Sequence, residues 1–523
     1  MAQSNSQVLE SQLEYLSLSK PRKVLYKITH FFTGIPKAVS HKSRDLVKKQ
    51  RKTAKGFLGI FHNLFVAMKE GDYKTRLSFL LMGFGLFTRR QIIRGVCYFL
   101  YEIAYILFMV VIGGPALSKL PTLGVVAGGQ YASTQGILDI MVSVYNDNSF
   151  TILLYSLIAI ILTLLLVFLW YNQIRDSKEL QDKEEIGKYA SDRVTIKNVF
   201  DKAYDKTLLF LPIGTLFIFT ILPIIMMVVI AFTNYNFLHE PSSKLFDWVG
   251  FYNFETIFSS NADVKNPIFL QTFGKVLLWT LVWAFFATFS NYFIGMIVAM
   301  IINIKGIKLK KVWRTILITT IAVPQFISLL LISQMFAESG VINTMLQNWG
   351  WIKSPIKFLS DPVLAKVMII VINTWVGIPY TMLICTGLLM NIPEDLYESA
   401  RIDGASPARM YFKITLPYML FVTGPYLISQ FVGNINNFNV IYLLSGGGPA
   451  FTFTTSDVPS LIRDTNLGQT DLLITWIYKI TTNRSYDYGT ASVLGILIFA
   501  VVAFFSLIFY GRSGSVKDEE AFQ

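Results

Sequence analysis

The sequence has little charge and almost no cysteine or histidine, and each shortage excludes a class of protein. Charged residues make up 15% of the chain, whereas soluble domains usually carry about 25%. Two cysteines cannot form a disulfide framework, and the four histidines show no metal-ligand spacing. No stretch reads G-x-x-x-x-G-K-[ST], so the chain carries no phosphate-binding loop of the usual kind. We therefore exclude a soluble enzyme, a disordered scaffold, a disulfide-stabilised secreted protein and ATP hydrolysis by the usual route in this chain.

Long apolar runs take the place of the missing charge. Hydrophobic residues make up 53% of the 523 residues, and the mean hydropathy is +0.50. A helix needs about 20 mostly apolar residues to cross the hydrocarbon layer. Eight stretches meet this length, which predicts an all-α polytopic membrane protein with eight transmembrane helices. They are residues 95–113, 151–170, 207–232, 275–302, 313–335, 365–390, 418–443 and 489–510.

Positive charge is concentrated before the first of these spans. Residues 1–94 hold 18 Lys or Arg against 5 Asp or Glu, and the loop 303–314 is also basic. Loops 114–150 and 444–488 carry few charges. Because cytoplasmic loops are enriched in Lys and Arg, this pattern predicts that both termini lie in the cytoplasm.

The basic N-terminal region, residues 1–94, is expected to form amphipathic helices on the cytoplasmic leaflet. In 41–70, apolar and basic side chains interleave, as such a helix requires; a solvated basic tail is the alternative. These side chains are Leu46, Phe57, Phe61, Leu64 and Phe65 with Lys48, Lys49, Arg51, Lys52 and Lys55. The apolar stretch 77–87 is only half long enough to span, so we expect an interfacial elbow that bends at Gly83 and Gly85.

The later spans are more polar than the earlier ones. From about residue 275 they carry prolines, amides and small residues in mid-span, which are tolerated only where they face protein or water. We therefore expect a working core at 275–512, preceded by more peripheral helices. The other regions are the first two spans with their cytoplasmic linker (95–206), the third span with a short external loop (207–274) and a cytoplasmic tail (513–523).

The loop 394–417 between the sixth and seventh spans is predicted to form two short helices around a turn. Residues 394–401 suit a helix, and Gly404 permits the left-handed backbone conformation that ends it. Ser406 is a good N-cap, and Pro407 fits the first helical position. A rigid helix of this kind suits docking against a cytoplasmic partner.

This loop resembles the EAA motif of permeases in ATP-binding-cassette importers. The motif appears as Glu398, Ser399 and Ala400, then Asp403, Gly404 and Ala405, then Ile414, Leu416 and Pro417. The departure is Ser399, where the family pattern has alanine. The resemblance implies a type I importer permease fold and a coupling helix that enters a cleft of a separate ATPase subunit. In that role Glu398 contacts the ATPase and Gly404 shapes the turn.

The seventh span carries three amides in a regular pattern. Gln430, Asn434 and Asn437 fall at i, i+4 and i+7, which predicts one stripe along one continuous helix. Amides both donate and accept hydrogen bonds, as sugar hydroxyls require, although bonding between helices is the alternative role. In the sixth span, residues 373–380 add a predicted kink at Pro379 and aromatic faces on which a sugar ring could stack.

From about residue 270 to 512 the chain resembles the MalF-type maltose/maltodextrin permeases of the MalFG subfamily. The sugar contacts that this resemblance implies are Gly377, Tyr380, Asn434 and Asn437, with Val376, Gln430 and Phe438 as weaker candidates. Gly433 stands where the family has an aromatic residue, which leaves the stacking partner and the preferred sugar open. The short external loop 233–274 and the basic N-terminus are similar to Gram-positive members, which import maltodextrins or arabinogalactan oligomers.

The resemblance also implies a location and a set of partners. The chain is expected to cross the bacterial cell membrane several times and to move oligosaccharides delivered by an extracellular sugar-binding lipoprotein. Its partners would be a second, MalG-like permease and two ATPase subunits of the MalK or MsmX type. No cofactor or metal is expected in this chain, because ATP and magnesium bind the ATPase subunits, and no nucleic acid is expected.

Two other classes of membrane protein remain as alternatives. An ion-coupled secondary transporter usually places ionisable residues at mid-membrane, whereas here only Glu102 lies well inside a span, where we expect a paired structural group. A membrane anchor or regulator would explain the basic N-terminus but would leave the coupling loop and the amide stripe without a role. Protein-coupled ATPase activity would separate the importer from both.

Overall fold

The computed structural model describes residues 61–125, 131–133, 141–143, 147–187, 204–239, 244–258, 267–304, 306–453 and 460–512, with single positions 59, 189, 192, 197, 200 and 201. Most of the predicted amphipathic helix over 41–70 lies outside these ranges, as does the tail 513–523. Its last ten residues, 61–70, are helical, and Phe61 and Phe65 are exposed on them.

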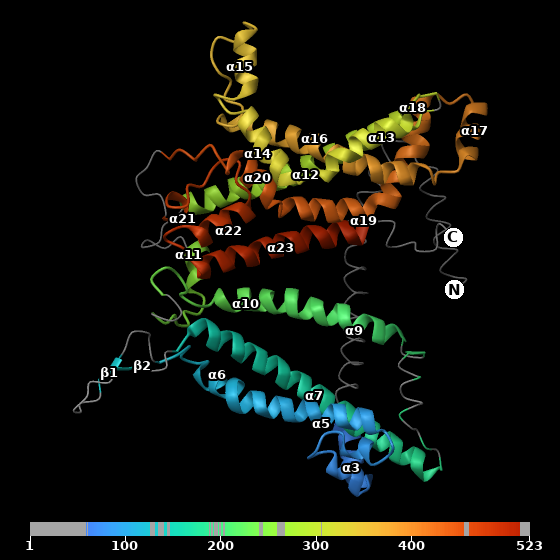
Figure 1. Ribbon diagram of the computed structural model, residues 1–523, viewed down its shortest axis with the longest axis vertical. Coiled ribbons are helices and arrows are strands. Elements are labelled where there is room, and N and C mark those ends of the chain that lie inside the picture. Colours follow the sequence, from blue (N-terminus) through green and yellow to red (C-terminus); the bar gives the residue numbers. More distant parts are fainter. Residues whose placement is uncertain are drawn as a thin grey trace, which may run out of the picture. The chain divides into compact units, whose positions relative to one another are not determined.

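The chain divides into two compact units (Figure 1). Unit 1 comprises Met1–Pro115 and Ile158–Pro212, and unit 2 comprises Ala116–Leu157 and Ile213–Gln523. The predicted sugar contacts and the predicted coupling loop all belong to unit 2.

The helices of unit 1 begin with two short segments and continue with long apolar ones. They are α3 (Tyr73–Leu77), α4 (Phe84–Phe87), α5 (Ile92–Phe108) with a π-helical continuation at Met109–Gly113, the later part of α7 (Ser149–Glu185) and the first part of α9 (Tyr204–Leu216). The 37 residues of α7 extend well past the predicted span 151–170, so part of the predicted linker is helical.

The predicted bend within 77–87 is confirmed at Gly83, whereas Gly85 lies inside α4. The chain bends at Gly83, whose φ of 80° is unfavourable for a residue with a side chain. A Cβ atom there would also lie 2.2 Å from the carbonyl oxygen of Gly95 on α5. The bend therefore depends on glycine for both its backbone conformation and its close approach to α5.

Side chains of the long helices satisfy backbone groups of the elbow. Glu102 of α5 accepts a hydrogen bond from the N–H of Met82 at 2.8 Å, and Trp170 of α7 donates to the carbonyl of Phe79 at 3.0 Å. Irregular backbone is tolerated at membrane depth only when its polar groups are satisfied by protein. Glu102 is thus the paired structural group that the sequence predicted.

A buried arginine joins the segment before the elbow to α7. The guanidinium of Arg89 lies 2.5 Å from the carboxylate of Asp72, 3.2 Å from that of Glu184 and 2.9 Å from Oγ of Ser177. Burial raises the pKa of Asp72, but hydrogen bonds from Thr75 and Arg89 outweigh it, so the net pKa lies below the ordinary value. The carboxylate therefore stays ionised opposite Arg89.

Unit 2 contains most of the helices. They are α6 (Gly114–Lys119), α10 (Leu222–Ile230), α11 (Tyr252–Phe258), α12 (Pro267–Asn303), α13 (Lys310–Thr319), α14 (Gln325–Met335), α15 (Val341–Asn348), α16 (Pro362–Leu389), α17 (Glu394–Ile402), α18 (Pro407–Met410), α19 (Leu416–Ile435), α20 (Phe438–Ser445), α21 (Ser460–Arg463), α22 (Leu473–Thr482) and α23 (Tyr488–Arg512). A small antiparallel ribbon, β1 (Tyr131–Ser133) with β2 (Met141–Ser143), is the exception to the predicted all-α class.

Six helices among the described residues are long and apolar enough to cross a membrane, or seven if one bent pair counts as a span. That pair is α13 and α14, which meet at 90° and replace the continuous helix expected over 313–335. Pro324 explains the break, because a proline disfavours helical backbone in the preceding residue, and Val323 is extended.

Burial within the described chain differs between the early and late spans. In α12 and α16, 39% of the residues in the apolar window are buried, against 6% in the first and third spans. Trp283 of α12 is fully buried, and its indole donates to the carbonyl of Asn434 at 3.0 Å. Among the six long helices of the described chain, α12 and α16 are therefore the best packed.

The external loop expected over 444–488 contains a helix that the sequence analysis missed. Leu473, Trp476 and Ile480 of α22 are buried in a cluster with the first turns of α12 and α23. Their spacing is that of one helical face, so the signal was present in the sequence.

Candidate functional site

Two glycines allow α12 and α16 to approach closely. A Cβ atom on Gly377 of α16 would lie 2.6 Å from Nδ2 of Asn291, and one on Gly295 of α12 would lie 2.7 Å from Cβ of Thr381. Small residues permit such contacts between membrane helices. Gly377, a predicted sugar contact, therefore also sets the spacing of the helix pair and brings the Asn291 amide against its backbone.

Two amides beside this contact have polar atoms without a partner. Oδ1 of Asn291 and Nδ2 of Asn373 are buried, and neither has a hydrogen-bond partner among the described residues. Asn373 lies one turn before Gly377 on the same face of α16. A buried unpaired polar atom costs about 1–3 kcal/mol, so these amides are suited to binding a polar ligand that is present only part of the time.

Sequence reasoning did not select either amide as a site residue. Asn373 stood in the segment 373–380 that drew attention for its proline and aromatic residues, and Asn291 stood in the fourth span among aromatic residues. An amide within an apolar run was the available signal. Only the helix packing shows which amide atoms lack a hydrogen-bond partner in the described chain.

Asn434 on α19 is hydrogen bonded to two neighbouring side chains. It is 9% exposed, its Nδ2 donates to Oγ1 of Thr288 on α12 at 2.9 Å, and its Oδ1 accepts from Nδ2 of Asn437 at 3.3 Å. The hydrogen bond between helices, which was the alternative role for these amides, is therefore present at Asn434.

The stripe of three amides along one continuous helix is a prediction that the structure contradicts. Helix α19 ends at Ile435, and α20 begins at Phe438. Asn437 is the N-cap of α20, with its Oδ1 accepting from the N–H of Val440 at 3.3 Å. Asparagine favours this capping position because its side chain replaces the missing backbone acceptor. The break still leaves Asn434 and Asn437 in contact.

The remaining predicted contacts lie around this break. Val376 packs against the buried cluster that contains Val440 of α20, and Gln430 is half-buried one turn before Asn434. Tyr380 is 51% exposed on α16, which continues through Pro379 without ending. Phe438 stacks on Tyr442 and meets Tyr478 edge-on, with ring centroids 4.8 and 4.7 Å apart respectively. No hydrogen bond joins the α16 members to the α19–α20 members within the described chain.

A glycine-rich turn follows α20 and packs closely against a buried carboxylate. Gly447 has a φ of 86°, and a Cβ atom there would lie 2.0 Å from Oδ1 of Asp471. Asp471 is fully buried and pairs with Lys479 at 2.6 Å. Burial raises the pKa of Asp471, and the charge of Lys479 and hydrogen bonds from Gly468 and Thr475 offset only part of that rise.

The predicted turn of the coupling loop and its capping residues are confirmed, but the second helix is not a separate short one, because α18 continues through a π-helical segment (Tyr411–Thr415) into α19. Helix α17 ends before Gly404, whose φ of 72° is left-handed. Ser406 caps α18 by accepting from the N–H of Arg409 at 3.3 Å, and Pro407 occupies the first helical position. Oη of Tyr397 lies 2.8 Å from Oγ1 of Thr415, which attaches α17 to the start of α19.

The coupling loop stands out from one end of unit 2. Figure 1 shows α17 and α18 at the end opposite α11, α21 and α22. Glu398, Ser399, Asp403 and Gly404 are exposed, whereas Ala400 and Ala405 are half-buried. Ile402, beside the turn, is 86% exposed.

Comparison with known proteins assigns the chain to a family. Residues 291–514 match the family described as "binding-protein-dependent transport system inner membrane component". The chain is 32% identical over 457 residues to the maltodextrin transport system permease protein MdxF of Bacillus subtilis (strain 168), an alignment that covers 86% of this chain and 97% of MdxF. The chain belongs to this family.

Two further relatives differ in the sugar that their names give. The galactooligosaccharides transport system permease protein GanP of Bacillus subtilis (strain 168) is 35% identical over 386 residues, which covers 73% of this chain and 88% of GanP. The maltose/maltodextrin transport system permease protein MalF of Escherichia coli (strain K12) is 37% identical over 262 residues, which covers 50% of this chain and 48% of MalF.

Membership of the binding-protein-dependent transport family confirms the resemblance that the coupling loop and the amide-bearing spans indicated. The family match begins at Asn291 and includes Gly377, Gly404 and Asn434. The chain is therefore an inner-membrane transport component, and its apolar helices are the membrane-crossing part of an importer.

Proposed function

We propose that the chain is a permease subunit that moves maltose/maltodextrin-type oligosaccharides across the membrane, driven by a separate ATPase. The main support for this proposal is the exposed coupling loop. A rigid turn at Gly404, with Ile402 uncovered beside it, is suited to a cleft in another protein. Glu398, Ser399, Ala400, Asp403, Gly404 and Ala405 are the residues that we assign to this contact.

The proposed topology has eight crossings with both termini in the cytoplasm. The six long helices, the bent pair α13–α14 and the broken pair α19–α20 together supply eight. Broken helices of this kind are accepted in membranes where they line a water-filled path or pack on protein. The proposed division into an N-terminal basic region (1–94), a peripheral part (95–274) and a core (275–512) follows from the same topology.

We assign the sugar path to the face where α12, α16 and the α19–α20 break meet. Gly377, Tyr380, Asn434 and Asn437 remain the proposed contacts, with Val376, Gln430 and Phe438 beside them. Asn434 and Asn437 are hydrogen bonded to each other, so a sugar would bind to a preformed amide pair. The half-exposed ring of Tyr380 offers the stacking surface that Gly433 cannot supply.

The proposed assembly contains a second, MalG-like permease, two ATPase subunits of the MalK or MsmX type and an extracellular sugar-binding lipoprotein. ATP and magnesium bind to the ATPase subunits in this assembly, and the chain itself needs no cofactor. Transport then depends on closure of the ATPases against the coupling loop.

The same machine with a galacto-oligosaccharide substrate is the second candidate. The 35% identity to GanP over 386 residues is comparable to that to the maltodextrin permeases. The decisive experiment reconstitutes the chain with its second permease, an ATPase and the binding protein, and follows ATP hydrolysis with maltotriose or a galacto-oligosaccharide. Stimulation by maltotriose alone supports the first candidate, and stimulation by the galactan alone supports the second. No stimulation in an assembled complex contradicts both.

The substitution Gly404→Pro tests whether the coupling loop docks against the ATPase. Proline cannot adopt a φ of 72°, so the turn changes and coupled ATP hydrolysis is expected to be lost while membrane insertion persists. Gly350→Pro is the matched control, because Gly350 is also exposed, has the same φ of 72° and lies outside the coupling loop. Normal coupling in Gly404→Pro would contradict the assignment.

A further inference from the structure

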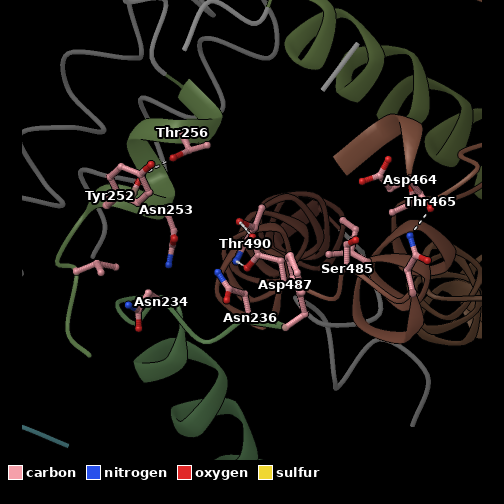
Figure 2. Close-up of a pocket in the computed structure, with 14 residues that line it drawn as sticks. Asn234, Asn236, Tyr252, Asn253, Thr256, Asp464, Thr465, Ser485, Asp487 and Thr490 are labelled. Atoms are coloured by element: carbon pink, nitrogen blue, oxygen red, sulfur yellow. Dashed lines mark hydrogen bonds between the residues drawn. The ribbon is translucent and has the colours of Figure 1, made fainter. Parts of the chain in front are cut away.

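A polar cavity of about 710 Å³ lies in unit 2, at the end opposite the coupling loop. Figure 2 shows residues of four segments around it: the loop after α10, α11, the residues that follow α21, and the stretch from the end of α22 into α23. In the proposed topology this end faces the outside of the cell. The predicted sugar contacts do not line this cavity.

The walls of the cavity are fixed by backbone hydrogen bonds. The N–H of Phe237 donates to the carbonyl of Tyr486 at 2.8 Å, and the N–H of Tyr488 donates to the carbonyl of Tyr235 at 3.0 Å. A Cβ atom on Gly489 would lie 2.7 Å from Nδ2 of Asn253, so only glycine lets α23 start this close to α11. The cavity therefore exists before any ligand binds.

Two asparagines present opposite hydrogen-bonding groups to the cavity. Asn236 uses its Oδ1 to accept from the N–H of Leu238 at 3.0 Å and from Nδ1 of His239 at 2.8 Å, which leaves its Nδ2 as a donor. Asn253 uses its Nδ2 to donate to the carbonyls of Ala231 and Thr233, which leaves its Oδ1 as an acceptor. One fixed donor and one fixed acceptor match a hydroxyl-bearing ligand.

The charges of the lining disfavour an anion, and its carboxylates do not form a metal site. No Lys, Arg or His lines the cavity, and its two carboxylates are already engaged. Asp487 accepts from the N–H and Oγ1 of Thr490 at 2.9 and 2.7 Å, and Asp464 pairs with Arg463 at 3.0 Å. The described residues contain no group of three acidic, His or Cys side chains that could hold a metal. The lining is therefore suited to a neutral polar ligand.

We propose that this cavity is an outer binding site for a neutral oligosaccharide. Tyr252, 59% exposed at its edge, supplies an aromatic face for a sugar ring. The volume lies within the range of about 300–1,000 Å³ that small-molecule sites occupy, whereas a protein partner needs a broad face of about 1,200–2,000 Å² in total. This inference rests on the proposed function for the orientation of the cavity and for the class of sugar.

The test is protection of a cysteine placed in the cavity. Ser485 is an exposed lining residue, and Ser485→Cys is labelled with a water-soluble maleimide in the intact complex without ATP. Maltotriose at about ten times its Kd is expected to slow labelling about tenfold. Glu255→Cys is the matched control, since Glu255 is exposed on α11 and does not line the cavity. The unsubstituted chain, with Cys97 and Cys385, gives the background.

A second variant fills the cavity. Thr256→Trp, made together with Ser485→Cys, is expected to abolish the protection, whereas Glu255→Trp on the same helix leaves the tenfold effect intact. An unchanged labelling rate with maltotriose and with a galacto-oligosaccharide overturns the proposal. Slowing by the binding protein alone, with no sugar present, also overturns it and identifies a protein-docking surface instead.

The labelling assay is independent of transport. Sugar-stimulated ATP hydrolysis by the unsubstituted complex tests the proposed function by itself. A complex that transports maltotriose but shows no protection contradicts only the outer site. A complex that is protected but does not transport contradicts only the proposed function.

Discussion

Among the described residues, buried polar groups are paired in unit 1, whereas some in unit 2 have no partner. In unit 1, Glu102 accepts from the elbow and Arg89 is surrounded by carboxylates and hydroxyls. The buried side-chain atoms without a partner among the described residues all belong to unit 2, and they include Oδ1 of Asn291 and Nδ2 of Asn373. The difference indicates that polar groups in unit 1 stabilise the fold, whereas the two open amides in unit 2 are available to a ligand.

Removing the buried arginine of unit 1 is expected to have the largest effect on stability. Arg89→Met leaves Asp72 without its cation and leaves Glu184 with only Lys74, 3.7 Å away, and should lower the free energy of unfolding by about 3 kcal/mol. This value is toward the lower end for a buried pair because both carboxylates are about one-third exposed. Thermal unfolding of the purified protein measures the change.

The control for this variant is the neighbouring arginine. Arg90 is exposed, and its guanidinium lies 5.1 Å from the ring centre of Tyr189. Arg90→Met should therefore cost below about 1 kcal/mol. Equal stability of the two variants would contradict a structural role for Arg89.

A larger side chain at Gly377 tests the packing beside the open amides. Gly377→Val forces a Cβ atom against Asn291 and should destabilise the protein by about 2 kcal/mol and abolish uptake. Gly387→Val on the same helix is the control, since a Cβ atom at Gly387 meets nothing within 4 Å. Uptake by Gly377→Val at the level of Gly387→Val would mean that α12 and α16 do not need this close approach.

Replacement by leucine should change the free energy of unfolding in opposite directions for an amide with an unpaired buried atom and for a hydrogen-bonded amide. Asn373→Leu removes an unpaired buried donor and should raise the free energy of unfolding by about 1 kcal/mol while lowering sugar uptake about tenfold. Asn434→Leu removes a donor to Thr288 and should lower stability by about 1 kcal/mol. Thermal unfolding and uptake are measured on both. A change of stability in the same direction for both variants would remove the distinction between the two kinds of amide.

The smallest effect on stability is expected from titration of the buried carboxylate of Asp471. Its pKa is raised above the ordinary value of 3.8 chiefly by burial, so the folded protein holds this proton more tightly than the unfolded chain does. The stability of the wild type relative to Asp471→Asn should therefore fall as pH rises through the raised pKa, and should then become constant. Thermal unfolding of both proteins across this pH range measures it, and a relative stability that rises with pH would show that pairing with Lys479 outweighs burial.

Local backbone rules explain why the coupling loop could be predicted residue by residue. The left-handed Gly404, the capping Ser406 and the first-turn Pro407 each follow from the conformations that the residue itself permits. The same rules explain why the prediction of an amide stripe along one continuous helix was wrong. Asn437 can cap a helix as readily as it can lie within one, and periodicity alone does not decide between them.

The bend between α13 and α14 and the helix α22 show what hydropathy cannot predict. Hydropathy identified 313–335 as one apolar stretch and 444–488 as a loop, because it averages over residues and is insensitive to a single proline or a short buried helix. The bend could have been predicted from Pro324. The helix could have been predicted from the spacing of Leu473, Trp476 and Ile480.

By itself the sequence determined the membrane class, the coupling turn and the family, because composition, residue conformation and motif spacing do not depend on what packs nearby. Only the tertiary structure decided which amides are paired. Asn434 finds Thr288 across the α12–α19 contact, whereas Asn291 and Asn373 keep one polar atom each without a partner in the described chain. The partner of a buried amide is set by the helix beside it, and that helix comes from a distant part of the chain.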